Sequence, residues 1–222
     1  MINCIAFDFD GTLVDSNRIK HETFFDVVAG SKAGVDVMNS VLLENPGDRF
    51  EIFRRFLELL PNTFTSQTPA QPENSVTALA AEYTARSEDA VTACQEVPGA
   101  ERLLAQLRQQ GIITAVISAT PTSALSAIVA RRGWNEAFCH VFGRPNDKFE
   151  NLSRLSTTTS LIPDEIMMVG DKQEDLQAAN DFGCHFVAVI SSDNDFVTSP
   201  SYAITSLGQL VELMDQINEA EA

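Results

Sequence analysis

The sequence predicts an α/β fold in which a mostly parallel β-sheet is covered by helices on both faces. Short apolar runs typical of buried strands recur along the chain, at residues 5–7, 112–117, 137–142, 166–169 and 185–190. Segments of helical length separate these runs, and such alternation is typical of parallel sheets. Several runs also end in acidic or hydroxyl side chains, which places polar groups at the sheet edge where ligands bind in open α/β folds.

The first apolar run opens the most informative segment of the chain, IAFDFDGTLVDS, which delivers Asp8 and Asp10 directly after a short strand. Gly11 permits a tight turn after the two acids, and the following residues lead away from that turn. Both carboxylates are therefore expected at the carboxyl edge of the first strand. Acids in this position are candidates for catalysis or for metal binding.

The interval between residues 17 and 94 breaks the alternation, because it contains helical patterns and no convincing strand. A loop rich in Pro, Thr and Gln, up to residue 74, separates an expected helix at 49–60 from another at 75–93. The sequence EVPG then indicates the return to the sheet. We expect an α/β core domain at residues 1–16 and 95–222, with an inserted helical domain at residues 17–94. The apolar face of the 49–60 helix is formed by Phe50, Phe53, Phe56, Leu57 and Leu60.

Further helices are expected after the return crossing. Two helical patterns stop at glycines, residues 101–110 before Gly111 and residues 123–132 before Gly133. A serine and a glutamine at positions 206 and 209 have the spacing of a capping box, ahead of a last amphipathic helix. These helices complete the alternation that predicts the parallel sheet.

Composition limits the partners. The 222 residues suffice for one good core, or for a core domain with a smaller appended domain. The 15 basic and 31 acidic side chains give a formal net charge of −16, which repels nucleic acids and anionic lipids at long range. The apolar runs are too short to cross a membrane, and with the first strand expected from Ile2 we expect no secretory signal. We expect a cytoplasmic protein with a small-molecule partner, and the sequence carries no signal for an oligomeric state.

The paired acids suggest a bound cation. Two carboxylates within one turn repel each other in a low-dielectric crevice, so both stay ionised only if a cation shares the site or one keeps a proton. Mg²⁺ suits the position, because it takes oxygen ligands and needs only one or two protein carboxylates. An EF-hand calcium loop is the alternative, but it requires Gly in place of Leu13 and Glu in place of Ile19. The sequence therefore predicts Mg²⁺ as the cofactor.

Other apolar runs lead to further polar groups. Ser118 ends the second run and Ala119 begins the next turn, so a hydroxyl and a backbone N–H are offered to an anion. Lys148 lies in a loop ahead of a helix, and the fourth run presents Asp171, with Asp175 one helical turn further on. Taken singly, these residues read as turn residues, solvated charges or helix caps. Taken together, they match a phosphoryl group bound to Mg²⁺.

In order and spacing, these segments resemble the motifs of the haloacid dehalogenase-like superfamily. The likeness is to its phosphatase branch with an inserted helical cap, which includes phosphoglycolate phosphatases and β-phosphoglucomutase-like proteins. DFDGTLVDS resembles the first motif, Ser118 the second, Lys148 the third and GDKQED the fourth. The resemblance covers nearly the whole chain. It implies a Rossmann-like core and Mg²⁺-dependent hydrolysis of a small phosphomonoester through an aspartyl-phosphate.

The same resemblance implies a role for each motif residue. Asp8 would be the nucleophile and Asp10 the general acid and base. Ser118, the Ala119 turn and Lys148 would bind the phosphate. The metal would be held by Asp8, by the backbone carbonyl of Asp10 and by Asp171. Asp175 would hold a water bound to the metal, or would contact the metal ligands from outside.

Alternative functions remain on the sequence alone. A phosphosugar mutase shares all four motifs, and a non-catalytic phosphoacceptor or binding module also combines Asp, Ser or Thr and Lys at strand ends. Dehalogenation is disfavoured, because a halide leaves without a proton and does not need the second acid, Asp10. In this superfamily the cap usually selects the substrate, so Lys20, His21 and Arg49 are the candidates to contact the leaving group. Phosphoglycolate, a sugar phosphate and a nucleoside monophosphate would all suit the core.

Overall fold

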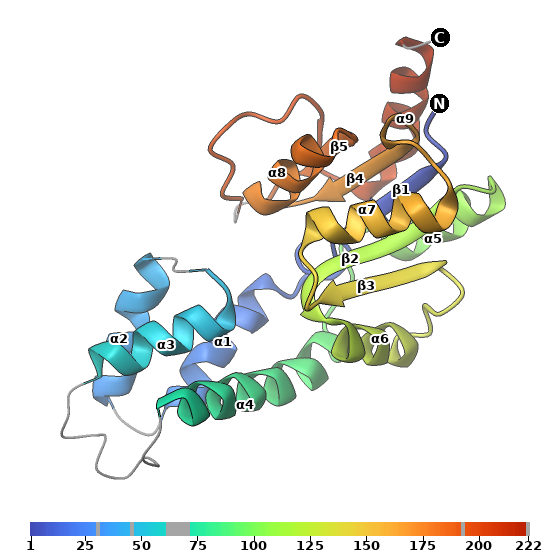
Figure 1. Cartoon of the computed structure of the whole chain (residues 1–222). Helices are drawn as coiled ribbons and strands as arrows, with labels where there is room; N and C mark the ends of the chain where they lie inside the picture. Colours follow the sequence, from blue (N-terminus) through green and yellow to red (C-terminus); the bar gives the residue numbers. More distant parts are fainter. Residues whose placement is uncertain (30–31, 45–46, 61–71, 192–193, 221–222) are drawn as a thin grey trace. The chain divides into compact units, whose positions relative to one another are not determined.

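A computed structural model describes residues 1–29, 32–44, 47–60, 72–191 and 194–220 of the chain (Figure 1). The chain divides into two compact units, one formed by Met1–Asn17 with Thr92–Ala222 and the other by Arg18–Val91. In the first unit, six strands form a fully parallel sheet in the order β3-β2-β1-β4-β5-β6. This confirms the predicted α/β class. The strands are β1 (Cys4–Phe7), β2 (Ile113–Pro121), β3 (His140–Arg144), β4 (Ile166–Gly170), β5 (His185–Val189) and β6 (Ala203–Ile204).

The central strands are apolar because both of their faces are covered. Every residue of β1 and of β4 is buried, as expected for parallel strands between two helical layers. Helices α7 (Lys148–Thr159) and α8 (Gln173–Phe182) pack together over one face, where Leu152 and Leu176 join Ala6 and Met168 in one cluster. Helices α5 (Ala100–Gln109) and α6 (Thr122–Arg131) pack against β2, and their buried leucines lie outside that cluster, which places them on the opposite face. The last helix, α9 (Leu210–Ala220), follows a single 3₁₀ turn that Ser206 caps.

The second unit consists of helices in its described residues, which are α1 (Asn17–Val28), α2 (Lys32–Glu44), α3 (Arg49–Leu59) and α4 (Pro72–Ala93). Its core is aromatic, with the rings of Phe24 and Tyr83 stacked at 4.2 Å. Asp48 and Glu51 form a capping box that starts α3 at its predicted position. The expected apolar face of α3 is partly wrong, because Phe53 is buried but Phe50 is 41% exposed. Most of the expected loop before residue 74 lies outside the described residues.

Three predicted element boundaries need correction. Strand β2 continues to Pro121, so Ser118 lies inside the strand and does not end it, and Ala119 begins no turn. The extension follows a register shift against β3, where a side chain at Gly143 would overlap the backbone of β2. Strand β3 begins only at His140, because residues 137–139 still belong to the turn after α6. Lys148 is the first residue of α7 and not a loop residue, because Asp147 caps the helix there.

Candidate active site

The predicted site residues come together at the carboxyl edge of the sheet. Asp8 follows β1, Asp171 follows β4, Ser118 lies near the end of β2, and Lys148 begins the helix after β3. Because all the strands run in parallel, these positions share one edge. Strands β1 and β4 are neighbours at the place where the strand order reverses direction, and ligands of open α/β sheets bind at such a switch point.

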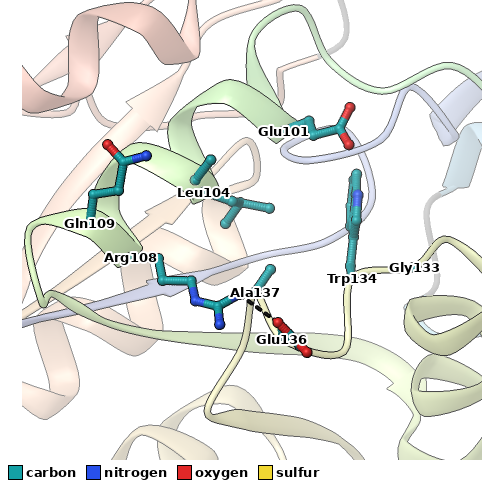
Figure 2. Close-up of a pocket in the computed structure, with 9 residues that line it drawn as sticks. Glu101, Leu104, Arg108, Gln109, Gly133, Trp134, Glu136 and Ala137 are labelled. Atoms are coloured by element: carbon teal, nitrogen blue, oxygen red, sulfur yellow. Dashed lines mark hydrogen bonds and ion pairs between the residues drawn. The ribbon is translucent and has the colours of Figure 1, made fainter.

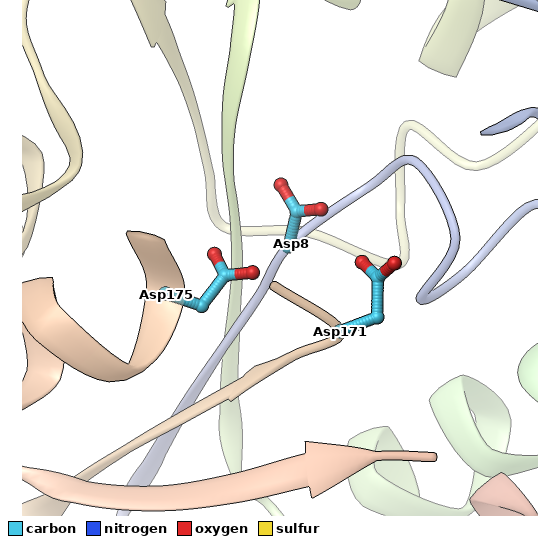
Figure 3. A group of neighbouring side chains, drawn as sticks. All are labelled: Asp8, Asp171 and Asp175. Atoms are coloured by element: carbon cyan, nitrogen blue, oxygen red, sulfur yellow. The ribbon is translucent and has the colours of Figure 1, made fainter. Parts of the chain in front are cut away.

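Three buried carboxylates gather at this edge (Figure 3). Asp8, Asp171 and Asp175 each offer an oxygen, and these oxygens lie within 4.8 Å of one another. The Lys148 ammonium lies among them, with its Nζ atom 3.1 Å from Oδ1 of Asp8 and 2.5 Å from Oδ1 of Asp175. All four side chains are almost completely removed from solvent. The cluster is therefore a buried charge network and not a solvated acidic surface.

Burial shifts the titration of this network. It raises the pKa of Asp8 to about 7 against the lowering effect of Lys148, and it raises the pKa of Asp171 to about 6, with a further contribution from the charge of Asp8. The pKa of Asp175 is raised by burial as well. Burial lowers the pKa of Lys148, but Asp175 and Asp8 outweigh it and hold that pKa above its ordinary value. The ammonium is therefore charged, and three carboxyl groups surround this one positive charge.

This donor set fits a hard divalent cation. Carboxylate oxygens are the ligands that Mg²⁺ prefers, and a divalent charge would balance the excess carboxylates around Lys148. Asp8 and Asp171 are the residues that would hold the ion, because Lys148 contacts Asp175 more closely than it contacts Asp8. The remaining expected ligand, the backbone carbonyl of Asp10, stays a prediction.

The loop after β1 wraps around Asp171. The Thr12 hydroxyl donates to Oδ1 of Asp171 at 3.2 Å, and the Asn17 amide donates to Oδ2 at 2.9 Å. Gly11 has a φ of +80°, and a side chain there would overlap both Asn17 and the Asp171 carboxylate. Glycine is thus required here for its backbone conformation and for space. The first motif therefore provides Asp8 and also orients the acid of the fourth motif.

Asp10 lies in a separate hydrogen-bonded environment. Its Oδ1 atom accepts from the Ser16 hydroxyl at 2.6 Å, and its Oδ2 atom lies 3.3 Å from the Thr120 hydroxyl and 3.5 Å from the Ser118 hydroxyl. The side chain is only half-buried, unlike Asp8. Two neighbouring carboxyl groups with different surroundings are suited to different tasks.

Several residues that support the site were missed by sequence reasoning. Thr120 contacts Asp10, and the Asn194 amide donates to the backbone oxygen of Asp171 at 2.7 Å and to that of Val189 at 3.1 Å. Ser16 ends the first motif and Asn17 follows it directly, so their position could have marked them. Asn194 lies in a polar segment after β5 and carries no such signal.

The expected specificity residues belong to the other unit. Lys20 and His21 lie on α1, and the His21 ring is tilted against Phe25 at 5.3 Å. Arg49 opens α3, where its Nη1 atom lies 3.4 Å from the Thr84 hydroxyl on α4. The contact of these residues with a leaving group stays a prediction.

The pKa shifts predict that the metal-free protein loses stability as the pH rises from about 4 to about 7. Unfolded Asp8 and Asp171 titrate near 3.8, whereas their folded pKa values are about 7 and about 6. Within this window the folded state holds protons that the unfolded state has released, so a rise in pH favours unfolding. The melting temperature in EDTA should therefore be lower at about pH 8 than at about pH 5. Asp171→Asn should reduce the difference between the melting temperatures at these two pH values. A melting temperature that rises with pH would contradict this account.

Comparison with known proteins gives the family. The family model for haloacid dehalogenase-like hydrolases matches residues 2–183. A phosphoglycolate phosphatase of Synechococcus elongatus is 27% identical, covering 97% of this chain and 99% of that protein. A glyceraldehyde 3-phosphate phosphatase of Pyrococcus furiosus is 26% identical, covering 99% of this chain and 96% of that protein. A crystal structure of a predicted phosphoglycolate phosphatase from Haemophilus somnus has a TM-score of 0.73 at 21% identity. The match covers 96% of this chain and 98% of that chain. The chain therefore belongs to the haloacid dehalogenase-like hydrolases, which confirms the family that its motifs resemble.

Proposed function

We propose that this chain is a Mg²⁺-dependent phosphomonoester hydrolase that acts on a small phosphorylated metabolite through an aspartyl-phosphate on Asp8. The observation that carries the proposal is the buried contact of Lys148 with Asp8, inside a carboxylate cluster at the switch point of the sheet. Family membership and the phosphatase names of the curated relatives support the same reaction class.

In the first step, an oxygen of the Asp8 carboxylate attacks phosphorus in line with the ester oxygen. The new Asp–O–P bond forms as the P–O bond to the leaving group breaks, and the leaving oxygen receives a proton from Asp10. Lys148 lies beside Asp8 and neutralises a phosphoryl oxygen, and the Ser118 hydroxyl is a further donor. When bound, Mg²⁺ supplies the positive charge that keeps Asp8 ionised and stabilises the phosphoryl oxygens.

In the second step, Asp10 accepts a proton from the water that attacks the aspartyl-phosphate, which releases inorganic phosphate and restores Asp8. The hydrogen bonds from Ser16 and Thr120 hold the Asp10 carboxyl in place for both proton transfers. Because Asp10 is half-buried, its proton can exchange with solvent while Asp8 stays buried beside Lys148.

We also propose that the helical domain at residues 17–94 acts as the cap of this enzyme and that Lys20, His21 and Arg49 contribute to substrate choice. The helical composition of Arg18–Val91 supports a separate substrate-selecting element. The partner is a small phosphomonoester. No helix in the described ranges has the length and apolar composition to cross a membrane, and the cytoplasmic location stays a prediction.

Phosphate release from a panel of phosphomonoesters tests the proposed function. The panel contains phosphoglycolate, glyceraldehyde 3-phosphate, glucose 1-phosphate and a nucleoside monophosphate, each assayed with Mg²⁺ and again with EDTA. We expect many turnovers on at least one compound, loss of activity in EDTA, and recovery when Mg²⁺ is restored. Release of one alcohol per protein, with the phosphoryl group kept on the protein and no free phosphate, would indicate a phosphoacceptor. Isomerisation of glucose 1-phosphate in the presence of a bisphosphate primer, without free phosphate, would indicate a mutase.

A further inference from the structure

A second pocket lies on the α/β unit and shares no lining residue with the candidate active site (Figure 2). Its cavity volume is about 600 Å³, which is within the range of small-molecule sites. Helix α5 forms one wall and the segment between α6 and β3 forms the other. The lining residues are Glu101, Leu104, Ala105, Arg108, Gln109, Gly133, Trp134, Glu136 and Ala137.

The pocket combines an apolar floor with a charged rim. Leu104 and Trp134 are buried, whereas Glu101, Arg108 and Glu136 are exposed around them. Figure 2 shows the Glu101 carboxylate above the edge of the indole, and the Arg108–Glu136 ion pair on the opposite side. A ligand for this pocket therefore needs a compact apolar body and a polar group that reaches the rim.

The sign of the rim charge selects that polar group. Among the lining residues, two carboxylates face one guanidinium, and Arg108 is engaged by Glu136 at 2.7 Å, so Glu101 is the lining carboxylate that is open to a cationic ligand. The Arg132 guanidinium beside Trp134 is not a lining residue and is turned to the backbone oxygens of Thr92 and Cys94. The side chains of that ion pair are 61% and 79% exposed, so the pair itself is weak. The whole chain adds a net charge of −16. These charges favour a cation and disfavour the phosphate group of a substrate.

The floor of the pocket is held in place before any ligand binds. The Trp134 ring makes edge contacts with Phe9 at 6.3 Å and with Phe138 at 6.4 Å, and the guanidinium of Arg132 lies 4.9 Å from its centroid. Leu104 is anchored in the buried stripe of α5. A pre-organised floor reduces the entropy that binding must overcome.

We propose that this pocket is a second small-molecule site that takes an organic cation, with one amine or amidine group on a flat hydrocarbon body. The cationic group contacts Glu101 at the rim. The hydrocarbon body lies against Leu104, Ala105 and the edge of Trp134 that lines the pocket. This proposal does not depend on the phosphatase reaction.

The chain offers a direct probe, because Trp134 is its single tryptophan. The probe ligand is benzamidine, titrated with Mg²⁺ and inorganic phosphate present so that the acidic cluster of the active site is occupied. Tryptophan fluorescence and calorimetry should give the same saturable curve, with a Kd on the order of 1 mM. Benzoate has the same shape and the opposite charge, and it should bind at least about tenfold more weakly.

Three variants locate the binding. Glu101→Gln should weaken benzamidine binding roughly fivefold, and Ala105→Phe should weaken it as well, because the new ring occupies the part of the cavity beside Leu104. The matched control Glu212→Gln, on an exposed position of α9, should bind as the wild type does. Unchanged melting temperatures and phosphatase activity would show that the variants are folded. Equal binding of benzoate, no saturable binding of benzamidine, or unchanged binding by Ala105→Phe would overturn the proposal.

Discussion

Replacing Asp8 with Asn is expected to abolish phosphatase activity, with kcat falling on the order of 10⁶-fold, as when a covalent nucleophile is removed from other enzymes. The amide is a much poorer nucleophile than a carboxylate and forms no stable phosphoryl ester. Folding should persist, because the two side chains have the same shape and Lys148 keeps its 2.5 Å contact with Asp175. The measurement is phosphate release at saturating Mg²⁺, together with mass spectrometry of the protein quenched in acid.

A matched variant separates this effect from a general loss of acidic charge. Asp215 is exposed on α9, so Asp215→Asn makes the same chemical change outside the site and should retain wild-type kcat. Wild-type protein quenched during turnover should carry one added phosphoryl group, and Asp8→Asn should carry none. A phosphorylated Asp8→Asn protein would place the nucleophile at another residue.

The sequence was sufficient to place most of the sheet and its acidic edge. Strands β1 and β4 are buried on both faces, so their residues are apolar without interruption and their ends are marked by the first acid that follows. A parallel sheet brings all such ends to one edge, which is why Asp8 and Asp171 could be paired across 163 positions of sequence. The apolar pattern of residues 49–60 likewise predicted α3, which begins at Arg49 as expected.

The remaining details depend on contacts between distant segments. Strand β2 continues past Ser118 because β3 approaches it closely at Gly143, and the apolar pattern around Ser118 contains no trace of that approach. Asn194 fixes the backbone of Asp171 from a polar segment with no periodicity. The raised pKa of Asp8 depends on complete burial beside Lys148, which the order of the motifs does not specify. Local patterns therefore predicted the elements, and tertiary packing determined the surroundings of the reacting groups.

Replacing Asp10 with Asn is expected to lower kcat for an alkyl phosphomonoester by roughly 10²–10⁴-fold, the usual range for a general acid and base. Asn keeps one oxygen that can accept from the Ser16 hydroxyl, and its NH₂ group can donate to the Thr120 hydroxyl oxygen, so the position of the side chain should be preserved. What is lost is the proton for the leaving alkoxide and the base for the attacking water. The measurement is steady-state phosphate release, with Asp215→Asn as the matched control.

The leaving group separates the two tasks of Asp10. p-Nitrophenolate departs without a proton, so the Asn variant should still transfer phosphate from p-nitrophenyl phosphate to Asp8 and then hydrolyse the intermediate slowly. A rapid-quench experiment should therefore show a burst of about one p-nitrophenol per protein and an accumulated phosphoenzyme. An Asp10→Asn protein within about threefold of wild type on alkyl substrates would refute this role. Equal losses on both kinds of substrate without a burst would restrict Asp10 to positioning the phosphate, because the first step would then depend on Asp10 even when no proton is needed.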